Sequence, residues 1–277
     1  MTATIGVFDS GFGGLTVLRA LLRRLPQARF VFLGDTARLP YGSKSRRTIA
    51  RYAAESAQFL VREQGADFLV IACNTASALA LDAIQDAVPV PVLGVIEPGA
   101  AAARAASKSG DVLVIATDAT VQSHAYAAAC RAQGLRAIEK ACPLLVPLVE
   151  EGWTDHPVTA EVFRIYLDEL LAAAANDSLN PDALVLGCTH YPLLRPLIER
   201  TIAHRAPAGI QVIDSAESTA EMAVRLFNGP AENSAPGAPG RPELRFFATD
   251  SVDKFERLGS RFLEQPVKGV ELIDLGG

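Results

Sequence analysis

Hydrophobic residues in this chain fall into short runs, many of them β-branched, that alternate with longer stretches whose apolar positions recur at helical spacing. The short runs predict buried strands, and the regular alternation predicts parallel sheet with helical crossovers. The expected strands are residues 4–8, 29–33, 68–72, 91–94, 111–116, 137–140, 183–186, 211–213, 244–248 and 270–273.

The longer stretches predict helices. Leu15, Leu18 and Leu22 show the spacing clearly, and Gly65 follows one long stretch as a good C-cap residue. Residues 228–243 are rich in Gly, Pro and Ala and predict an exposed, mobile loop. The expected helices are residues 15–25, 44–64, 100–108, 120–133, 143–151, 158–175, 215–227 and 252–263, with two more that begin at residues 74 and 192.

The pattern of strand and helix starts afresh after the fourth strand, which predicts an α/β fold in two similar lobes. Each lobe is expected to hold a mainly parallel sheet flanked by helices, with the active site in the cleft between the lobes. Turn-forming residues at 97–99 and 206–209 indicate where the lobes divide. We therefore expect residues 1–97 plus 210–277 to form the first lobe and residues 98–209 the second.

Composition narrows the class of protein. Hydrophobic residues make up 49% of the 277 positions and charged residues 21%, an ordinary balance for a globular protein. No apolar run approaches the roughly 20 residues of a membrane-spanning helix, and the amino terminus lacks the pattern of a signal peptide. We expect a cytoplasmic protein with no membrane role, and the net charge of −5 gives no support for a nucleic-acid partner.

Two of the four cysteines stand where strands are expected to end. Cys73 follows the buried run at 68–72, and Cys188 follows the run at 183–186 after a glycine. Ligands of open parallel sheets bind outside the carboxyl ends of the strands, so both thiols are candidates for chemistry. Cys130 and Cys142 fit the ordinary role of small buried apolar residues, and all four are expected to be free thiols.

Each candidate thiol precedes an expected helix, and a helix N-terminus lowers a thiol pKa from its usual ~8.5. We therefore expect Cys73 and Cys188 to hold useful thiolate fractions near neutral pH. Two thiols on opposite sides of an α-carbon can remove a proton from one face and return one to the other. This chemistry inverts the centre and requires no cofactor.

Other chemistries explain less of the pattern. The glycine-rich run that starts at Asp9 suggests a dinucleotide site, but the third fingerprint glycine would fall at Thr16. Cys188, His190, Cys73 and Asp9 could ligate zinc, although Cys-x-His is an uncommon ligand spacing. A Cys-His nucleophilic enzyme would explain only one of the two thiols. A non-catalytic binding module would explain neither. Taken alone, His190 could be a core histidine with its hydrogen bonds satisfied.

Four motifs resemble those of bacterial glutamate racemases, in the aspartate/glutamate racemase superfamily, and they follow in the same order. They are residues 9–15, 34–38 with 40–42, 73–76 and 187–192. The resemblance implies a cofactor-independent, two-base racemase that makes D-glutamate for peptidoglycan. It also implies a homodimer with glutamate as the small-molecule substrate and no metal site.

The resemblance also implies roles for single residues. Cys73 would take the α-proton of D-glutamate, and Cys188 that of L-glutamate. Asp9 would assist the first thiol and His190 the second. Asp35, Glu150, Thr117 and Thr120 match further positions of the family, the two acids without a settled role. The expected substrate contacts are Asp9, Ser10, Tyr41, Gly42, Asn74, Thr75, Thr189 and His190.

The resemblance leaves two alternatives open. The same two thiols would serve a racemase of aspartate or of a related acidic compound. A decarboxylase or isomerase of the superfamily would need only one thiol, and the presence of both cysteines argues against that alternative.

Overall fold

The computed structural model describes residues 3–206, 209–228 and 243–276. The loop expected at 228–243 therefore lies outside the described residues, apart from its two ends. In the part of the chain that the structure describes, no helix is long and apolar enough to span a membrane.

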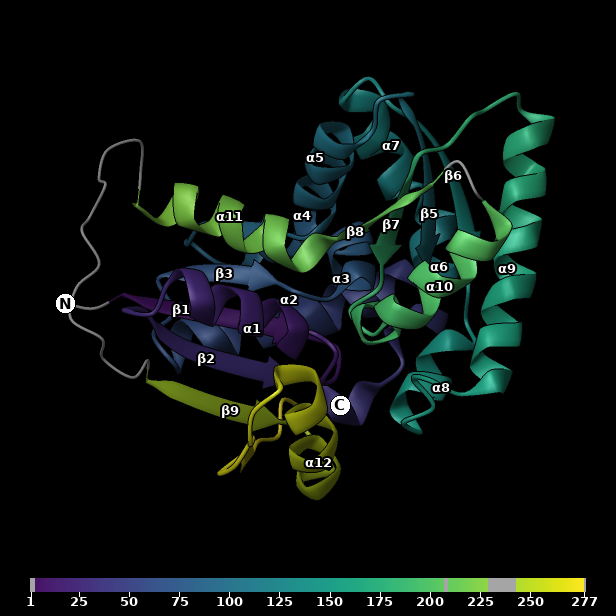
Figure 1. The fold of residues 1–277 in the computed structure, drawn as a ribbon. Helices are drawn as coiled ribbons and strands as arrows, with labels where there is room; N and C mark the ends of the chain where they lie inside the picture. The colour runs from purple at the N-terminus through teal and green to yellow at the C-terminus, as the bar shows by residue number, and fades with distance from the viewer. Residues whose placement is uncertain (1–2, 207–208, 229–242, 277) are drawn as a thin grey trace. The chain divides into compact units, whose positions relative to one another are not determined.

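The chain forms two compact units, drawn together in Figure 1. Unit 1 consists of Met1–Val95 and Ala216–Gly277, and unit 2 consists of Ile96–Ser215. The chain therefore leaves unit 1 after Val95 and returns to it after Ser215.

Unit 1 is built on a six-stranded sheet with the order β10-β9-β2-β1-β3-β4. Every neighbouring pair is parallel, and Ile5 lies in register with Phe30 on one side and Phe68 on the other. Figure 1 shows β9, from the C-terminal segment, beside the early strand β2. The strands are β1 (Thr4–Asp9), β2 (Arg29–Gly34), β3 (Phe68–Ile71), β4 (Val92–Gly94), β9 (Leu244–Ala248) and β10 (Glu271–Leu272).

Helices cover both faces of this sheet, and its strands β1 and β3 are therefore buried along their whole length. On one face, Phe8 and Ile71 belong to the same buried cluster as Leu60 of α2. On the other, the ring of Phe32 packs 5.9 Å from that of Phe255 in α12. The helices of unit 1 are α1 (Leu15–Arg24), α2 (Arg46–Arg62), α3 (Asn74–Leu79), α4 (Leu81–Ala87), α11 (Ser215–Asn228) and α12 (Val252–Leu263).

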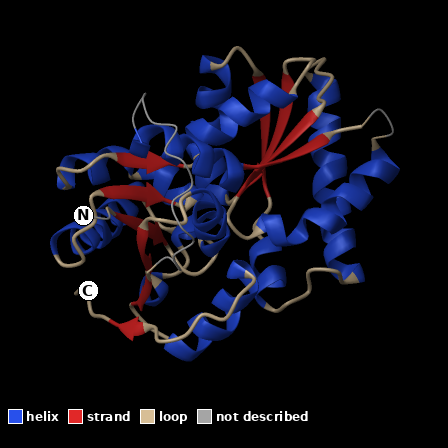
Figure 2. Ribbon diagram, turned by 60° about the vertical axis from the view of Figure 1, so that its left-hand side comes forward, coloured by secondary structure: helices blue, strands red, loops and turns tan. Residues whose placement is uncertain are grey.

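Unit 2 holds a four-stranded parallel sheet with the order β6-β5-β7-β8. Figure 2 shows its strands in red as a fan with helices around it. The strands are β5 (Asp111–Ala116), β6 (Arg136–Ala141), β7 (Ala183–Gly187) and β8 (Gln211–Asp214). The helices are α5 (Ile96–Ala106), α6 (Asp118–Ser123), α7 (Ala125–Ala132), α8 (Leu145–Glu150), α9 (Pro157–Asn176) and α10 (Arg195–Arg205).

The first four strands of each unit share one order. In each, the first strand of the unit lies in the middle, the second on one side of it, and the third and fourth on the other. The connections therefore reverse direction between β1 and β3 and again between β5 and β7. Ligands of open α/β sheets bind at the carboxyl ends of the strands at such a reversal.

The predicted α/β fold with two parallel sheets is confirmed, and the differences are local. α5 begins at Ile96 rather than near residue 100, and it tolerates Pro98 because first-turn N–H groups need no helical partner. The helix expected from Pro192 starts as a short 3-10 helix, η3 (Tyr191–Leu194), before α10. The helix expected at 120–133 is split into α6 and α7 at His124, whose φ is 54°.

A tight backbone approach holds the first strand–helix loop in place. A Cβ added at Gly34 would lie 2.1 Å from the carbonyl oxygen of Gly11 and 2.6 Å from Phe255. Gly34→Ala should therefore destabilise the protein by roughly 3 kcal/mol, since neither backbone segment can withdraw. Urea unfolding measures the loss, with Gly110→Ala as the control.

Gly110 has a φ of +80° and nothing within 4 Å of an added Cβ. Its substitution should cost about 1 kcal/mol of backbone strain. Equal unfolding midpoints for the two variants would contradict the close-approach argument.

Candidate active site

The carboxyl edge of the unit 1 sheet brings the first predicted residues together. Asp9 ends β1, and Cys73 follows β3, the neighbouring strand. The Cys73 Sγ lies 3.4 Å from the Ser10 Oγ, within hydrogen-bonding distance for sulfur. Asp9 and Cys73 are almost fully buried, and Asp9 accepts a hydrogen bond from the Gly11 N–H at 2.9 Å.

Cys73 is also the N-cap residue of α3. Its Sγ accepts a hydrogen bond from the Ala76 N–H at 3.4 Å, as a serine or aspartate would in that position. Asn74 and Thr75 occupy the first turn of α3 and are buried. The edge of the sheet therefore gathers the thiol with polar side chains from two neighbouring loops.

The electrostatics of Cys73 differ from the expectation. Burial, and then the negative charge of Asp9, raise the pKa of Cys73 to about 12, against opposing hydrogen bonds with Ser10 and Ala76. The expected lowering by the helix N-terminus is wrong here, because desolvation of the thiolate outweighs a single N–H contact. Cys73 is a protonated thiol at neutral pH in this structure.

Tyr41 has a supporting position rather than an open one. It is in the 3-10 helix η2 (Tyr41–Ser43), its side chain is buried, and its hydroxyl donates a hydrogen bond to Asp35. Arg38 and Thr249 donate to the same carboxylate at 2.7 and 2.9 Å. Burial and Asp35 raise the pKa of Tyr41 above its ordinary value. The Tyr41 hydroxyl is thus engaged in its hydrogen bond with Asp35. The half-buried Gly42 beside it has only backbone groups available for contacts.

Unit 2 presents the second thiol in the corresponding place. Cys188 directly follows β7 and is buried together with Thr189 and His190. The Cys188 Sγ lies 3.9 Å from the His190 Nδ1, and the Thr189 Oγ1 lies 3.5 Å from the same nitrogen. The thiol therefore has an acid/base side chain beside it.

Glu150, at the end of α8, is the second partner of His190. The distance from its Oε1 to the His190 Nε2 is 3.4 Å. Burial lowers the pKa of His190, but the hydrogen bonds and charges of Cys188 and Glu150 outweigh it and raise that pKa to about 10. Sequence reasoning left Glu150 without a role, because no local pattern links it to a histidine in another loop.

Two threonines complete the carboxyl edge of the unit 2 sheet. Thr117 follows β5, the neighbour of β7, and caps α6 by accepting a hydrogen bond from the Thr120 N–H at 3.4 Å. The two hydroxyl oxygens lie 2.9 Å apart. Helix capping explains the hydrogen bond between them. They also lie where the connections reverse direction between β5 and β7, the place where hydroxyl contacts with a substrate are expected.

The predicted residues therefore form two groups. Unit 1 holds Asp9, Ser10, Tyr41, Gly42, Cys73, Asn74 and Thr75, and unit 2 holds Cys188, Thr189 and His190. Within the described ranges, no three His, Cys, Asp or Glu side chains are grouped as ligands of a metal ion.

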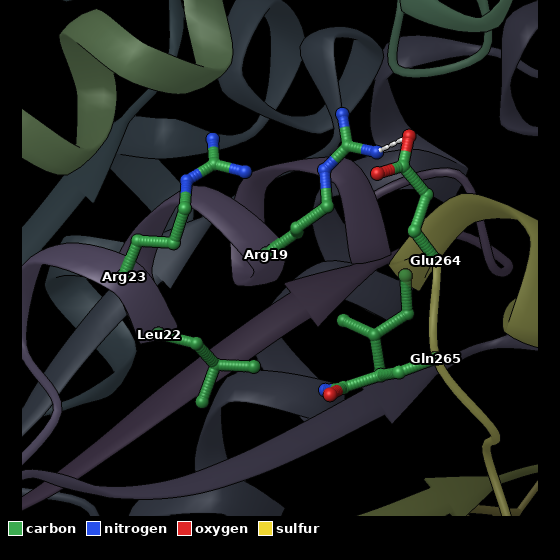
Figure 3. A pocket seen from close by; sticks show the side chains of 6 residues that line it. Arg19, Leu22, Arg23, Glu264 and Gln265 are labelled. Atoms are coloured by element: carbon green, nitrogen blue, oxygen red, sulfur yellow. Dashed lines mark ion pairs between the residues drawn. The ribbon is translucent and has the colours of Figure 1, made fainter.

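A pocket of about 320 Å³ in unit 1 lies elsewhere, between α1 and the end of α12 (Figure 3). Arg19 and Arg23 point the same way from α1, and Arg19 forms an ion pair with Glu264. Arg23 forms another with Glu217. Since both guanidinium groups already have carboxylate partners, this pocket is not a candidate for binding an acidic substrate.

Comparison with known proteins gives a consistent result. The sequence profile of the Asp/Glu/hydantoin racemase family matches residues 5–223. The chain is 54% identical to a glutamate racemase of Koribacter versatilis, over 99% of this chain and 98% of that protein.

Solved structures agree. A glutamate racemase of Francisella tularensis, in complex with D-glutamate, superposes with a TM-score of 0.84 at 35% identity, covering 99% of this chain and 98% of that one. Glutamate racemase isoform RacE1 of Bacillus anthracis gives 0.85 at 36% identity with the same coverage.

The raised pKa of Cys73 predicts how fast this thiol is alkylated. Because the thiolate is the nucleophile, its rate with iodoacetamide should rise about tenfold per pH unit from pH 7 to 10 without a plateau. Asp9→Asn removes a charge that raises the pKa, so alkylation at pH 8 should be several-fold faster. Mass spectrometry of the Cys73 peptide measures both rates.

Asp86→Asn, at an exposed carboxylate of α4, is the matched control and should leave the rate unchanged. A plateau below pH 9 in the wild-type protein would contradict the environment described for Cys73.

The raised pKa of His190 predicts that this residue's contribution to the free energy of unfolding depends on pH. Its pKa is about 10 in the folded protein and ~6.5 unfolded, so its stabilisation is full below pH 6.5 and is lost as the pH rises toward 10. The difference in unfolding free energy between wild type and His190→Gln should therefore shrink across this interval. Urea unfolding at pH 6, 8 and 10 measures it.

Glu150→Gln should remove much of this pH dependence, since Glu150 is one of the two partners that raise the pKa of His190. A difference between wild type and His190→Gln that stays constant with pH would argue against a protonated His190.

Proposed function

Because the chain belongs to the Asp/Glu/hydantoin racemase family, we propose that it interconverts L-glutamate and D-glutamate by a two-thiol, cofactor-independent mechanism. A racemase is an isomerase, and the proposal concerns its substrate and its catalytic groups. One observation carries it. Each unit places a buried thiol after the third strand of its sheet, beside the reversal of the connections, with an acidic or basic side chain next to it.

In the proposed reaction, Cys188 as a thiolate takes the α-proton of L-glutamate, and the Cys73 thiol gives a proton to the opposite face. The electron pair of the broken C–H bond stays on the α-carbon until that proton arrives. The product is D-glutamate, with the protonation states of the two thiols exchanged. The reverse reaction uses the same groups in opposite roles.

The two half-sites suit these opposite roles. Cys73 begins as a protonated thiol, which is the acid needed when L-glutamate is the substrate. On the other side, the protonated His190 places a positive charge 3.9 Å from the sulfur that acts as base. Asp9 and His190 are the groups proposed to help return Cys73 and Cys188 to their starting protonation states after turnover.

The polar residues around the thiols are proposed to hold the substrate. Ser10, Asn74, Thr75 and Thr189 can donate hydrogen bonds to carboxylate oxygens. Because the Tyr41 hydroxyl is committed to Asp35, the contribution of the Tyr41–Gly42 segment is proposed to come from its backbone.

The wider role follows the resemblance of the motifs. We propose that the protein works as a homodimer in the cytoplasm and supplies D-glutamate for peptidoglycan. The alternative substrate is aspartate or a related acidic compound. The names of the relatives favour glutamate, and turnover of both amino acids, assayed side by side, decides between them.

The direct test is racemisation by the wild-type protein and its thiol variants. In heavy water, wild type should exchange the α-proton of both enantiomers of glutamate for deuterium during turnover. Cys73→Ser and Cys188→Ser should each lower kcat by at least about 10³-fold, because a serine hydroxyl is a far weaker base at neutral pH. Circular dichroism follows turnover, and NMR follows exchange.

Cys130→Ala is the matched control, since this thiol is buried in α7. It should keep near-wild-type activity, and a chelator should leave the wild-type activity intact. Full activity of Cys188→Ser in both directions would exclude the two-thiol mechanism. Turnover of aspartate but not of glutamate would show that aspartate is the substrate, without contradicting the two-thiol mechanism.

A further inference from the structure

A buried tyrosine packs against Gly187, the residue that precedes the second thiol. Tyr126 is the second residue of α7, and its side chain is fully buried. A Cβ added at Gly187 would lie 2.9 Å from its Cε2, and one added at Gly99 would lie 3.3 Å from its Cε1 and its hydroxyl oxygen. The ring therefore packs between the end of β7 and the first turn of α5, and a Cβ at position 187 would clash with it.

The hydroxyl group of Tyr126 is held as well. It forms a hydrogen bond with the side chain of Ser215, which is also buried. Ser215 is the last residue of unit 2, and Gly99 lies close after its first residue, Ile96. One phenol thus contacts both places where the chain enters and leaves the unit.

The contact between the ring and Gly187 bears on catalysis, because Gly187 immediately precedes Cys188. We propose that Tyr126 is a positioning residue that fixes the Cys188 backbone through Gly187 and is itself anchored by Ser215. The proposal rests on the proposed function, since it assigns Tyr126 a part in the proton transfer of Cys188. Proton transfer depends steeply on geometry, and a misplacement of 1 Å can cost about 100-fold in rate.

Tyr126→Phe tests this, because it keeps the ring and removes only the anchoring hydroxyl. Loss of this hydroxyl should displace Cys188 by less than 1 Å and so lower kcat/KM about tenfold. The two enantiomers have equal free energy, so kcat/KM must fall equally in both directions. The distinguishing readout is the primary isotope effect, measured with L- and D-glutamate deuterated at the α-carbon.

If the variant slows only the proton transfer at Cys188, that transfer limits the rate of racemisation in both directions. The isotope effect on kcat/KM should then increase with L-glutamate, whose proton goes to Cys188, and decrease toward 1 with D-glutamate. A general loss of folded enzyme would change neither. Ser215→Ala should give the same asymmetry, and the double variant should be no slower than either single variant because both remove one hydrogen bond.

Tyr166→Phe is the matched control, since this tyrosine of unit 2 uses its hydroxyl to accept a hydrogen bond from the Leu144 N–H. It should leave both isotope effects as in wild type. A Tyr126→Phe protein with wild-type kcat/KM and wild-type isotope effects would overturn the positioning role and leave the proposed function intact.

Alkylation of the two thiols tests the positioning role if the wild-type protein fails to racemise glutamate. That result would refute the proposed function, and the positioning role would then be judged on iodoacetamide rates alone. Tyr126→Phe should alkylate at Cys188 several-fold faster than wild type and at Cys73 at the wild-type rate. Unchanged rates at both thiols would overturn the positioning role in this case too.

Discussion

The direction of parallel strands is the constraint on which this protein depends. All strands of a parallel sheet end at the same edge, and the shared strand order reverses the connections beside the first strand of each unit. Asp9 and Cys73 meet at that edge in unit 1, and Thr117 and Cys188 follow neighbouring strands in unit 2. Short loops after buried strands are thereby enough to place thiols, carboxylates and hydroxyls near one another.

The two thiols have different charged neighbours although their sequence contexts are alike. Around Cys73, loss of solvent and a neighbouring carboxylate both favour the neutral thiol. Around Cys188, a histidine held by Glu150 carries a positive charge instead. The proposed reaction needs an acid on one face of the substrate and a base on the other, and the opposite charges next to the two sulfurs suit these roles.

Several polar side chains at the sheet edges hold the loops in place through hydrogen bonds. Tyr41, Arg38 and Thr249 all donate to the buried Asp35, which joins the loop after β2 to the loop after β9. Tyr126 has a similar supporting place against Gly187. The contacts of Thr249 with Asp35 and of Tyr126 with Ser215 join segments far apart in the chain, and therefore no spacing in the sequence predicts them.

The sequence by itself determined the order of strands and helices, the α/β class and the candidate thiols, because apolar periodicity and strand-end positions are local properties. It did not reveal that Glu150 is the partner of His190 or that the Tyr41 hydroxyl is committed to Asp35. It also predicted the wrong direction for the pKa of Cys73. Only the tertiary structure decided these points, because desolvation and charge depend on which distant residues surround a group after folding.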